Sequence, residues 1–170
     1  MARAKGYQGI VARKKAATWG TAVAGGALDG IRVLPLEPNA DPEGIPDRSI
    51  TGRVTMTKQY AGNRTVNPMY TSYLRYEGNG RDYAGVSGTA GVPTTVDITG
   101  KKHVYKISDA FDAIFWTLAY EFLKDTKIGE IPSFKANKLT LRGESGKSWE
   151  IEVSGIGDDW KDTSAINTTT

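Results

Sequence analysis

Residues 137–153 read NKLTLRGESGKSWEIEV and have two incompatible interpretations. The centre, GESGKS at residues 143–148, shares letters with the phosphate loop of nucleotide-binding enzymes. That loop requires Gly-x-x-x-x-Gly-Lys-Ser/Thr, with the first Gly at the end of a strand and a helix beginning at the Lys. The residue five positions before Gly146 is Leu141, so the first Gly of the pattern is missing.

The residues that follow Lys147 favour the other interpretation, a β-hairpin. Apolar Trp149, Ile151 and Val153 alternate with polar residues, which is the period of a half-buried strand. We predict a three-residue loop over residues 144–146, with Gly146 in the left-handed conformation that this loop type favours. The register then pairs Leu141 with Trp149, Leu139 with Ile151, Lys138 with Glu152 and Thr140 with Glu150.

The composition of the whole chain indicates one all-β domain. Of its 170 residues, 39% are hydrophobic and 24% charged, as in an ordinary soluble globular protein. Gly is abundant at 20 residues, strand-favouring Thr, Val, Ile and Tyr recur, and long helical patterns are absent. A net charge of +3 is too small to indicate nucleic-acid binding. The sequence also has no apolar run of the roughly 18 residues that a membrane span needs, and its basic N-terminus lacks the apolar segment of a secretory signal.

We divide the chain into an N-terminal arm (residues 1–30), a β-sandwich or barrel core (31–157) and a polar C-terminal tail (158–170). Within the core, residues 35–47 are rich in proline, which removes hydrogen-bond donors, and predict a long surface loop. Alternation of apolar and polar residues predicts strands, and Gly62 with Asn63 predicts a turn or loop. The expected strands are residues 30–36, 48–59, 68–77 and 103–107, and the expected turn or loop is 60–67.

Two segments each fit two structures. Residues 81–86 fit a short helix that stops at Gly88, or an open glycine loop. Residues 108–124 fit a helix with Ser108 as its N-cap, or a turn followed by a strand from Ala113. We favour the strand, because its residues are aromatic and β-branched. Its inward face would be Ile114, Trp116, Leu118, Tyr120 and Phe122, and its outward face Phe115, Thr117, Ala119 and Glu121.

Residues that could carry catalysis are scarce. The chain has no Cys, and its single His is His103, which excludes Cys-based sites and leaves a hydrolytic triad without a base. Asp41, Glu43 and Asp47 offer oxygen ligands for a hard cation, but the prolines between them match no known loop spacing. We therefore expect no enzyme activity, no metal and no cofactor.

Charge is distributed in a way that suggests assembly. A basic arm, an acidic proline-rich loop and an acidic C-terminal stretch are complementary patches, which would let copies associate head to tail into rings or filaments. The polar face of the 137–153 hairpin is a candidate for lining a tube or meeting a neighbour. The candidate interface residues are Arg3, Lys5, Arg13, Lys14, Lys15, Glu37, Asp41, Glu43, Asp47, Asp158 and Asp159, and the candidate hairpin face is Lys138, Arg142, Glu150 and Glu152.

The order of these features resembles the major tail proteins, or tail tube proteins, of long-tailed bacteriophages. The similar segments are ATWGT (17–21), the proline-rich loop, LRYEG (74–78), the Ala/Gly-rich stretch ending at Gly88, KHVYK (102–106), FWTLAY (115–120) and the final hairpin (135–141 with 149–153). Many members of that family carry an acid where this chain has Ala16 and Ala17.

The resemblance implies a β-sandwich or barrel with one flanking helix. It further implies a virion subunit, made in the bacterial cytoplasm, whose stacked rings, usually of six copies, form a hollow tube. Its partners would then be copies of itself, the tape-measure protein and DNA inside the tube, and other tail proteins at the tube ends, with no membrane. A different class of function, a monomeric module that binds carbohydrate or protein, would use Tyr70, Tyr73, Tyr76 and Tyr83 as a stacking surface.

Overall fold

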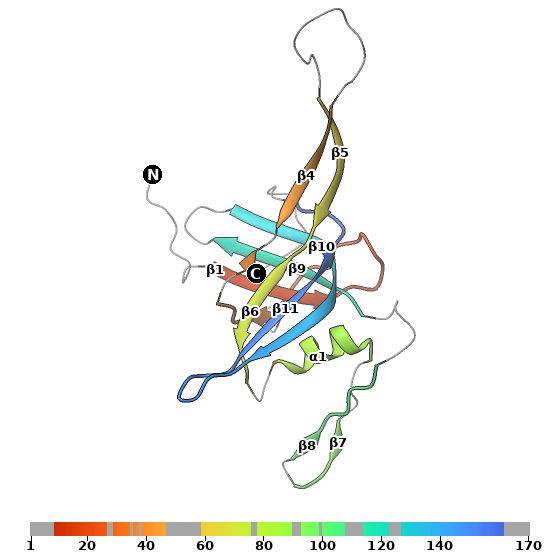
Figure 1. The fold of residues 1–170 in the computed structure, drawn as a ribbon. Helices are drawn as coiled ribbons and strands as arrows, with labels where there is room; N and C mark the ends of the chain where they lie inside the picture. Colours follow the sequence, from red (N-terminus) through yellow and green to blue (C-terminus); the bar gives the residue numbers. More distant parts are fainter. Residues whose placement is uncertain are drawn as a thin grey trace, which may run out of the picture.

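The computed structural model describes residues 9–26, 29–34, 36–37, 39–46, 59–75, 78–89, 93–98, 100–107, 114–122 and 127–161. These residues form strands and one short helix (Figure 1). In chain order the elements are β1 (Gly9–Lys15), β2 (Gly30–Ile31), β3 (Leu36–Glu37), β4 (Ala40–Pro46), β5 (Gln59–Val66), β6 (Met69–Tyr73), α1 (Gly80–Ser87), β7 (Thr94–Thr95), β8 (Lys101–Lys102), β9 (Trp116–Phe122), β10 (Lys127–Arg142) and β11 (Glu150–Gly157).

The described strands build one nine-stranded antiparallel sheet and a separate two-stranded ribbon, β7–β8. The main sheet runs β2-β1-β9-β10-β11-β5-β4, and β6 adds to β11 with β3 beside it. Strand β10 is the longest and pairs first with β9 and then with β11, with register shifts between Ile131 and Phe134 and between Ala136 and Lys138. Such irregularities bend a strand and increase its twist, so the sheet curls into a half-barrel (Figure 1).

Helix α1 packs against β10, and the core lies beneath it. Leu118, Ile131, Phe134, Ile151 and Val153 are fully buried there. Gly88 ends the helix with a φ of 75°, and its N–H donates to the carbonyl of Ala84 at 3.0 Å. Only glycine adopts that left-handed conformation without strain, so the expected short helix, with its stop at Gly88, is confirmed. The all-β fold with one flanking helix is confirmed with it.

The hairpin at residues 137–153 is confirmed, with a register that differs from the expected one. Leu141 faces Ile151 and Leu139 faces Val153, so each pair is displaced by two positions. The reason lies in Trp149, whose carbonyl accepts a hydrogen bond from the Leu74 N–H at 2.8 Å and whose ring lies over Gly143. Trp149 therefore belongs to the loop, and the strand begins at Glu150. Gly146 has the expected left-handed φ, at 80°.

No helix follows Lys147, as a phosphate loop would require. Its N–H donates to the Glu144 carbonyl at 3.1 Å, and its ammonium group pairs with the Glu144 carboxylate. The displacement by two positions keeps the side chains of the paired residues on their expected faces, because the side-chain period of a strand is two. The polar pairs become Lys138 with Ser154, Thr140 with Glu152 and Arg142 with Glu150.

Three loop and strand predictions were wrong. Residues 40–46 and 60–66 form the paired strands β4 and β5 instead of a loop and a turn. Proline is tolerated there because β4 ends the sheet and its register shifts between Pro42 and Gly44. The strand expected at residues 103–107 is absent, since pairing stops at β8. The strand expected over residues 48–59 lies almost wholly outside the described residues.

The predicted strand after residue 113 is confirmed as β9, although residues 108–113 lie outside the described part. The prediction of an outward face for this strand was wrong, because Thr117 and Ala119 are buried. Thr117 accepts a hydrogen bond from the Val23 N–H at 3.0 Å and donates one to the Pro132 carbonyl at 2.8 Å. The chain around residue 23 thus covers the second face of β9 at Thr117, and residues 116–119 of β9 are buried on both sides.

The predicted arm and tail also need correction where the structure describes them. Residues 9–15 are strand β1, which pairs with β9 along its whole length and with β2 on its other side. At the other end, Lys161 and Glu130 exchange backbone hydrogen bonds at 2.7 and 2.8 Å. Residues 9–15 and 158–161 are therefore parts of the folded body, because their backbone groups complete its sheet.

Candidate assembly surfaces

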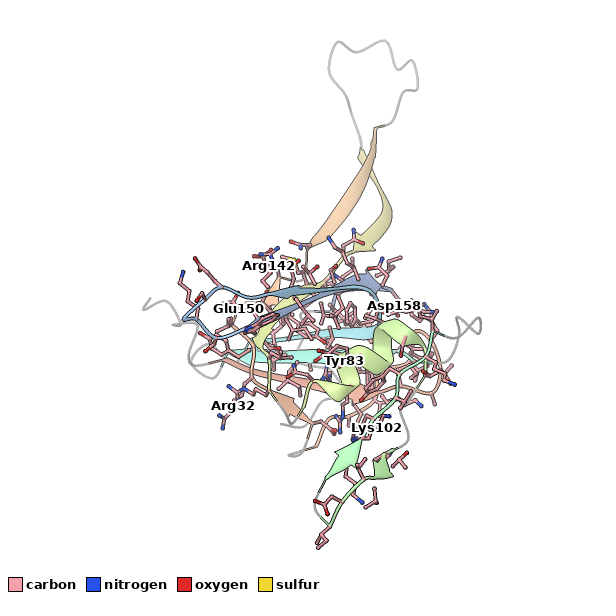
Figure 2. The ribbon with its side chains drawn as sticks, turned by 60° about the horizontal axis from the view of Figure 1, so that its bottom comes forward. Arg32, Tyr83, Lys102, Arg142, Glu150 and Asp158 are labelled. Atoms are coloured by element: carbon pink, nitrogen blue, oxygen red, sulfur yellow. The ribbon has the colours of Figure 1, made fainter. Side chains whose placement is uncertain are left out.

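The polar side of β6, β10 and β11 forms a continuous surface, which we call the outer face. Alternation along each strand turns Ile151 and Val153 into the core and turns the polar residues between them outward. The face comprises Lys138, Thr140 and Arg142 of β10, Glu150 and Glu152 of β11, and Thr71 and Tyr73 of β6. All four residues of the predicted hairpin face therefore lie together on it, and Figure 2 shows Arg142 and Glu150 at one end of the sheet.

The outer face is charged and open. Arg142 Nη2 lies 2.9 Å from Glu152 Oε2, and the Arg142 side chain is 64% exposed. The Glu152 side chain is only 14% exposed, so the Arg142 guanidinium is the member of this pair that a partner can reach. Glu37 of β3 is exposed next to this face, because it pairs with Met69 of β6.

Arg13, expected in an intersubunit contact, is instead buried between β1, β6 and α1. Its guanidinium donates to the Tyr70 hydroxyl at 2.7 Å, to the Gly78 carbonyl at 2.9 Å and to the Asp82 carboxylate. The Tyr70 hydroxyl donates to Asp82 Oδ1 at 2.5 Å, and Trp116 lies against the guanidinium. Arg13 therefore fastens the helix to the sheet.

The charges in this cluster stabilise one another. Burial alone would lower the pKa of Arg13, but its contacts with Tyr70 and Asp82 outweigh that effect and raise it. Burial raises the pKa of Tyr70 well above its ordinary value; Arg13 opposes this shift and the Asp82 carboxylate adds to it. The Tyr70 hydroxyl thus stays protonated and acts as a donor. Because Tyr70 is 2% exposed, it is not part of a stacking surface for a ligand.

The other predicted interface residues lie in several places. Lys14 donates to Asp29 Oδ2 at 2.7 Å, and Lys15 is exposed. Asp158 Oδ1 accepts from the Ser133 N–H at 2.9 Å and Asp159 Oδ1 from the Trp160 N–H at 2.8 Å, so both acids take part in local hydrogen bonds. Asp41 and Glu43 belong to the β4–β5 hairpin, which projects from the body (Figure 1). Arg3, Lys5 and Asp47 lie outside the described residues.

Several large apolar side chains are exposed, and sequence reasoning missed them. Trp149 is 54% exposed because it belongs to a loop, and period-two alternation had assigned it to the core. The others include Trp19, Leu74, Val96, Ile98, Ile107 and Ile156. Val96 and Ile98 follow β7, which pairs with β8 in a two-stranded ribbon, and no sequence signal marked these two side chains as uncovered.

Within the described part of the chain, no three His, Cys, Asp or Glu side chains are placed to share a metal ion. The helix that the structure describes is too short and too polar to cross a membrane.

Comparison with solved structures yields matches across almost the whole chain. A chain in the sheath/tube terminator of the PVC extracellular contractile injection system matches with a TM-score of 0.57 and 9% identity, covering 96% of this chain and 99% of that one. The fold is of the tail-tube type. A chain in the PVC sheath-tube complex matches with a TM-score of 0.55 and 9% identity, covering 95% of this chain and 93% of that one. A chain in the anti-feeding prophage cap matches with a TM-score of 0.54 and 10% identity, covering 97% of this chain and 93% of that one. No family model and no curated protein matches the sequence.

Proposed function

We propose that this protein is a structural subunit of a tail-tube assembly, whose copies form stacked rings around a channel. The observation that carries the proposal is the likeness of fold over 96% of this chain and 99% of a chain from a sheath/tube terminator. Both chains match over nearly their full length, so the likeness extends to the fold as a whole. The six-copy ring, the phage virion, the passage of DNA and the tape-measure protein belong to this proposal.

The exposed surfaces suit a self-assembling subunit. The outer face carries unburied Lys138 and Arg142 beside Glu150 and Glu152, and the β4–β5 hairpin extends away from the body (Figures 1 and 2). We propose that the outer face lines the channel or meets a neighbouring copy. The remaining interface candidates are the basic residues Arg3, Lys5, Lys14 and Lys15 and the acidic residues Glu37, Asp41, Glu43, Asp47, Asp158 and Asp159.

Negative-stain microscopy of the purified chain tests the proposal. The expected result is rings that stack into tubes at high protein concentration. Uniform monomers under all conditions would count decisively against it. The exposed double variant Lys138→Glu/Arg142→Glu then assigns the outer face: tubes persist if the face lines the channel, and they are lost if it meets a neighbour. Lys106→Glu, an exposed charge reversal away from that face, is the matched control.

A tube-terminating role is the second candidate, because two of the reported structures are a terminator and a tube-terminating cap. TM-scores of 0.57 and 0.55 against a terminator and a sheath-tube complex are too close to choose between the roles. The same micrographs separate them. Long tubes indicate a tube subunit, whereas single rings that do not stack indicate a terminator.

A further inference from the structure

A pocket lies between β1, the start of α1 and the segment that follows β8, and we call it the basic pocket. Its volume is about 480 Å³, which is within the range of small-molecule sites. None of the described residues that line it is an Asp or a Glu. Its charged and aromatic lining consists of Arg13, Lys15, Arg81, His103, Tyr105 and Trp116.

The segment after β8 forms one wall of the basic pocket because it packs on α1. The ring of Tyr105 lies 5.7 Å from that of Tyr83 on α1, and the imidazole of His103 stacks on Tyr105 at 6.2 Å with the two planes 9° apart. Gly80 permits this close approach, since a Cβ atom there would lie 2.7 Å from the Tyr105 hydroxyl. The wall therefore holds the exposed imidazole of His103 beside the start of the helix.

Arg13 and its partner Asp82 are the most deeply buried charges near the basic pocket. Asp82 accepts hydrogen bonds from Arg13, from the Tyr70 hydroxyl at 2.5 Å and from Asn79 Nδ2 at 3.3 Å, so its carboxylate is fully engaged. The Nε of Arg13 is also buried, and it has no acceptor among the described residues. Asp82 is therefore not available to a second cation.

The other cations of the basic pocket are not balanced by acids. Asp29 accepts from Lys14 at 2.7 Å, whereas Arg81 Nη1 reaches it only at 3.4 Å. The Arg81 side chain is 47% exposed. Lys15 is exposed and has no ionic partner among the described residues. The four cations Arg13, Lys14, Lys15 and Arg81 thus share two carboxylates, and the pocket keeps an excess of positive charge.

The chemistry of these groups selects the ligand. Lysine, arginine and imidazole N–H groups make their strongest hydrogen bonds to ionised oxygen atoms. A guanidinium offers a planar fork of donors and an ammonium group a compact charge, and both bind phosphate and carboxylate oxygens. An anion in the basic pocket would reach Lys15 and Arg81 without displacing an acid that lines it.

We propose that the basic pocket binds an oxyanion, a phosphate or carboxylate group, with Lys15 and Arg81 as its ligands and His103 at its rim. The site is independent of the proposed self-assembly. The oxyanion belongs either to a free small molecule or to an acidic side chain of a second copy, and these two sources share the same chemistry.

Inorganic phosphate is the probe, and His103 is the reporter because it is the only His of the chain. Untagged protein, kept below the concentration of assembly, is titrated with phosphate in place of chloride at fixed pH and ionic strength, and the imidazole proton resonances are followed by NMR. A saturable shift is expected. Phosphate that produces no shift, or a shift that does not saturate, overturns the inference.

The double variant Lys15→Gln/Arg81→Gln identifies the ligands. Its Kd for phosphate should rise about tenfold or more, as expected for losing charge-assisted hydrogen bonds. Its melting curve should be unchanged, because both side chains are exposed. Lys102→Gln is the matched control, since Lys102 is exposed and precedes His103 but does not line the pocket, and it should bind like wild type. An equal Kd for the double variant and the control overturns the inference.

Assembly in saturating phosphate distinguishes the two sources of the oxyanion. If an acidic side chain of a second copy occupies the basic pocket, phosphate competes with it, and both phosphate and the double variant raise the concentration needed for assembly severalfold. If the ligand is a free molecule, neither changes that concentration. A wild-type chain that never assembles overturns the proposed function, whereas the His103 titration still decides this inference.

Discussion

Arg13 is the residue whose environment does most to join the elements. It lies on β1, yet its guanidinium contacts Tyr70 of β6 and Asp82 of α1, and its exposed fraction is 2%. A buried cation of this kind is stable only while its carboxylate partner is present, since desolvation of an uncompensated charge is costly.

We therefore predict that Asp82→Ala lowers the free energy of unfolding by about 3–5 kcal/mol, because it leaves Arg13 buried without a counter-charge. Urea denaturation measures the change. The double variant Arg13→Met/Asp82→Leu removes both charges and should recover most of the loss. A single variant that loses less than about 1 kcal/mol, within the range of exposed pairs, would show that Arg13 is not held by Asp82.

Asp29 makes the stability of the folded protein depend on pH. The hydrogen bond from Lys14 lowers the pKa of Asp29, burial opposes it, and the Gly26 N–H at 2.9 Å and Arg81 add to the lowering. A carboxyl whose pKa is lowered on folding stabilises the protein above its unfolded pKa of about 3.9, and that stability is lost as the pH falls through the lower, folded pKa. Denaturation series at pH 7 and at successively lower pH below 4 should show a smaller acid-induced loss for Asp29→Asn than for wild type. Parallel curves for the two proteins would contradict this.

At the scale of the elements, the bulge in β10 depends on Gly155. A Cβ atom there would overlap the Lys135 carbonyl oxygen and lie 2.8 Å from the Ala136 Cα, and backbone atoms cannot rotate away as a side chain does. We predict that Gly155→Ala destabilises the fold by about 1–3 kcal/mol, the usual cost of overpacking. Gly30→Ala is the control, because nothing lies within 4 Å of its added Cβ, and it should change stability by less than about 0.5 kcal/mol. Equal melting temperatures for the two variants would refute the prediction.

Sequence periodicity predicted β9 and β11, and the sequence offered α1 as one of two alternatives, because the packing of these elements follows local rules. Period two places Ile151 and Val153 inward in any register, and Gly88 ends the helix by its own conformation. The wrong predictions lie where residues distant in sequence determine the local structure. The Leu74 backbone captures Trp149 and lengthens the hairpin loop, and the edge position of β4 accommodates Pro42 as a strand residue.

The candidate surfaces follow the same division. The four charged residues of the outer face could be grouped from alternation alone, since strands place every second residue on one side. The burial of Arg13 could not be predicted from the sequence, because its partner Asp82 is remote in sequence and only the fold brings the two residues together. Nor does a pattern of residues reveal that Val96 and Ile98 lack cover, because cover is supplied by the rest of the fold.

At the scale of the whole molecule, strand β1 is part of the sheet, so residues 1–15 cannot be deleted as if they were a separate N-terminal arm. Pairing of β1 with β9 runs from Gly9 with Phe122 to Lys15 with Trp116, and Arg13 carries the charge opposite Asp82. Deleting residues 1–15 exposes the edge of β9, opens the core at Val11 and leaves Asp82 buried without its cation. These losses together are comparable with the roughly 5–15 kcal/mol that holds a typical domain folded.

We therefore predict that the chain lacking residues 1–15 is unfolded or aggregated, whereas the chain lacking residues 1–8 keeps its fold, because the described sheet begins at Gly9. Circular dichroism melts and size-exclusion chromatography compare the two. The shorter deletion then isolates the contribution of Arg3 and Lys5 to assembly, since both are removed while Lys14 and Lys15 stay on β1. A cooperative melt of the longer deletion at the temperature of the shorter one would mean that β1 is dispensable, and the role assigned to Arg13 would fall with it.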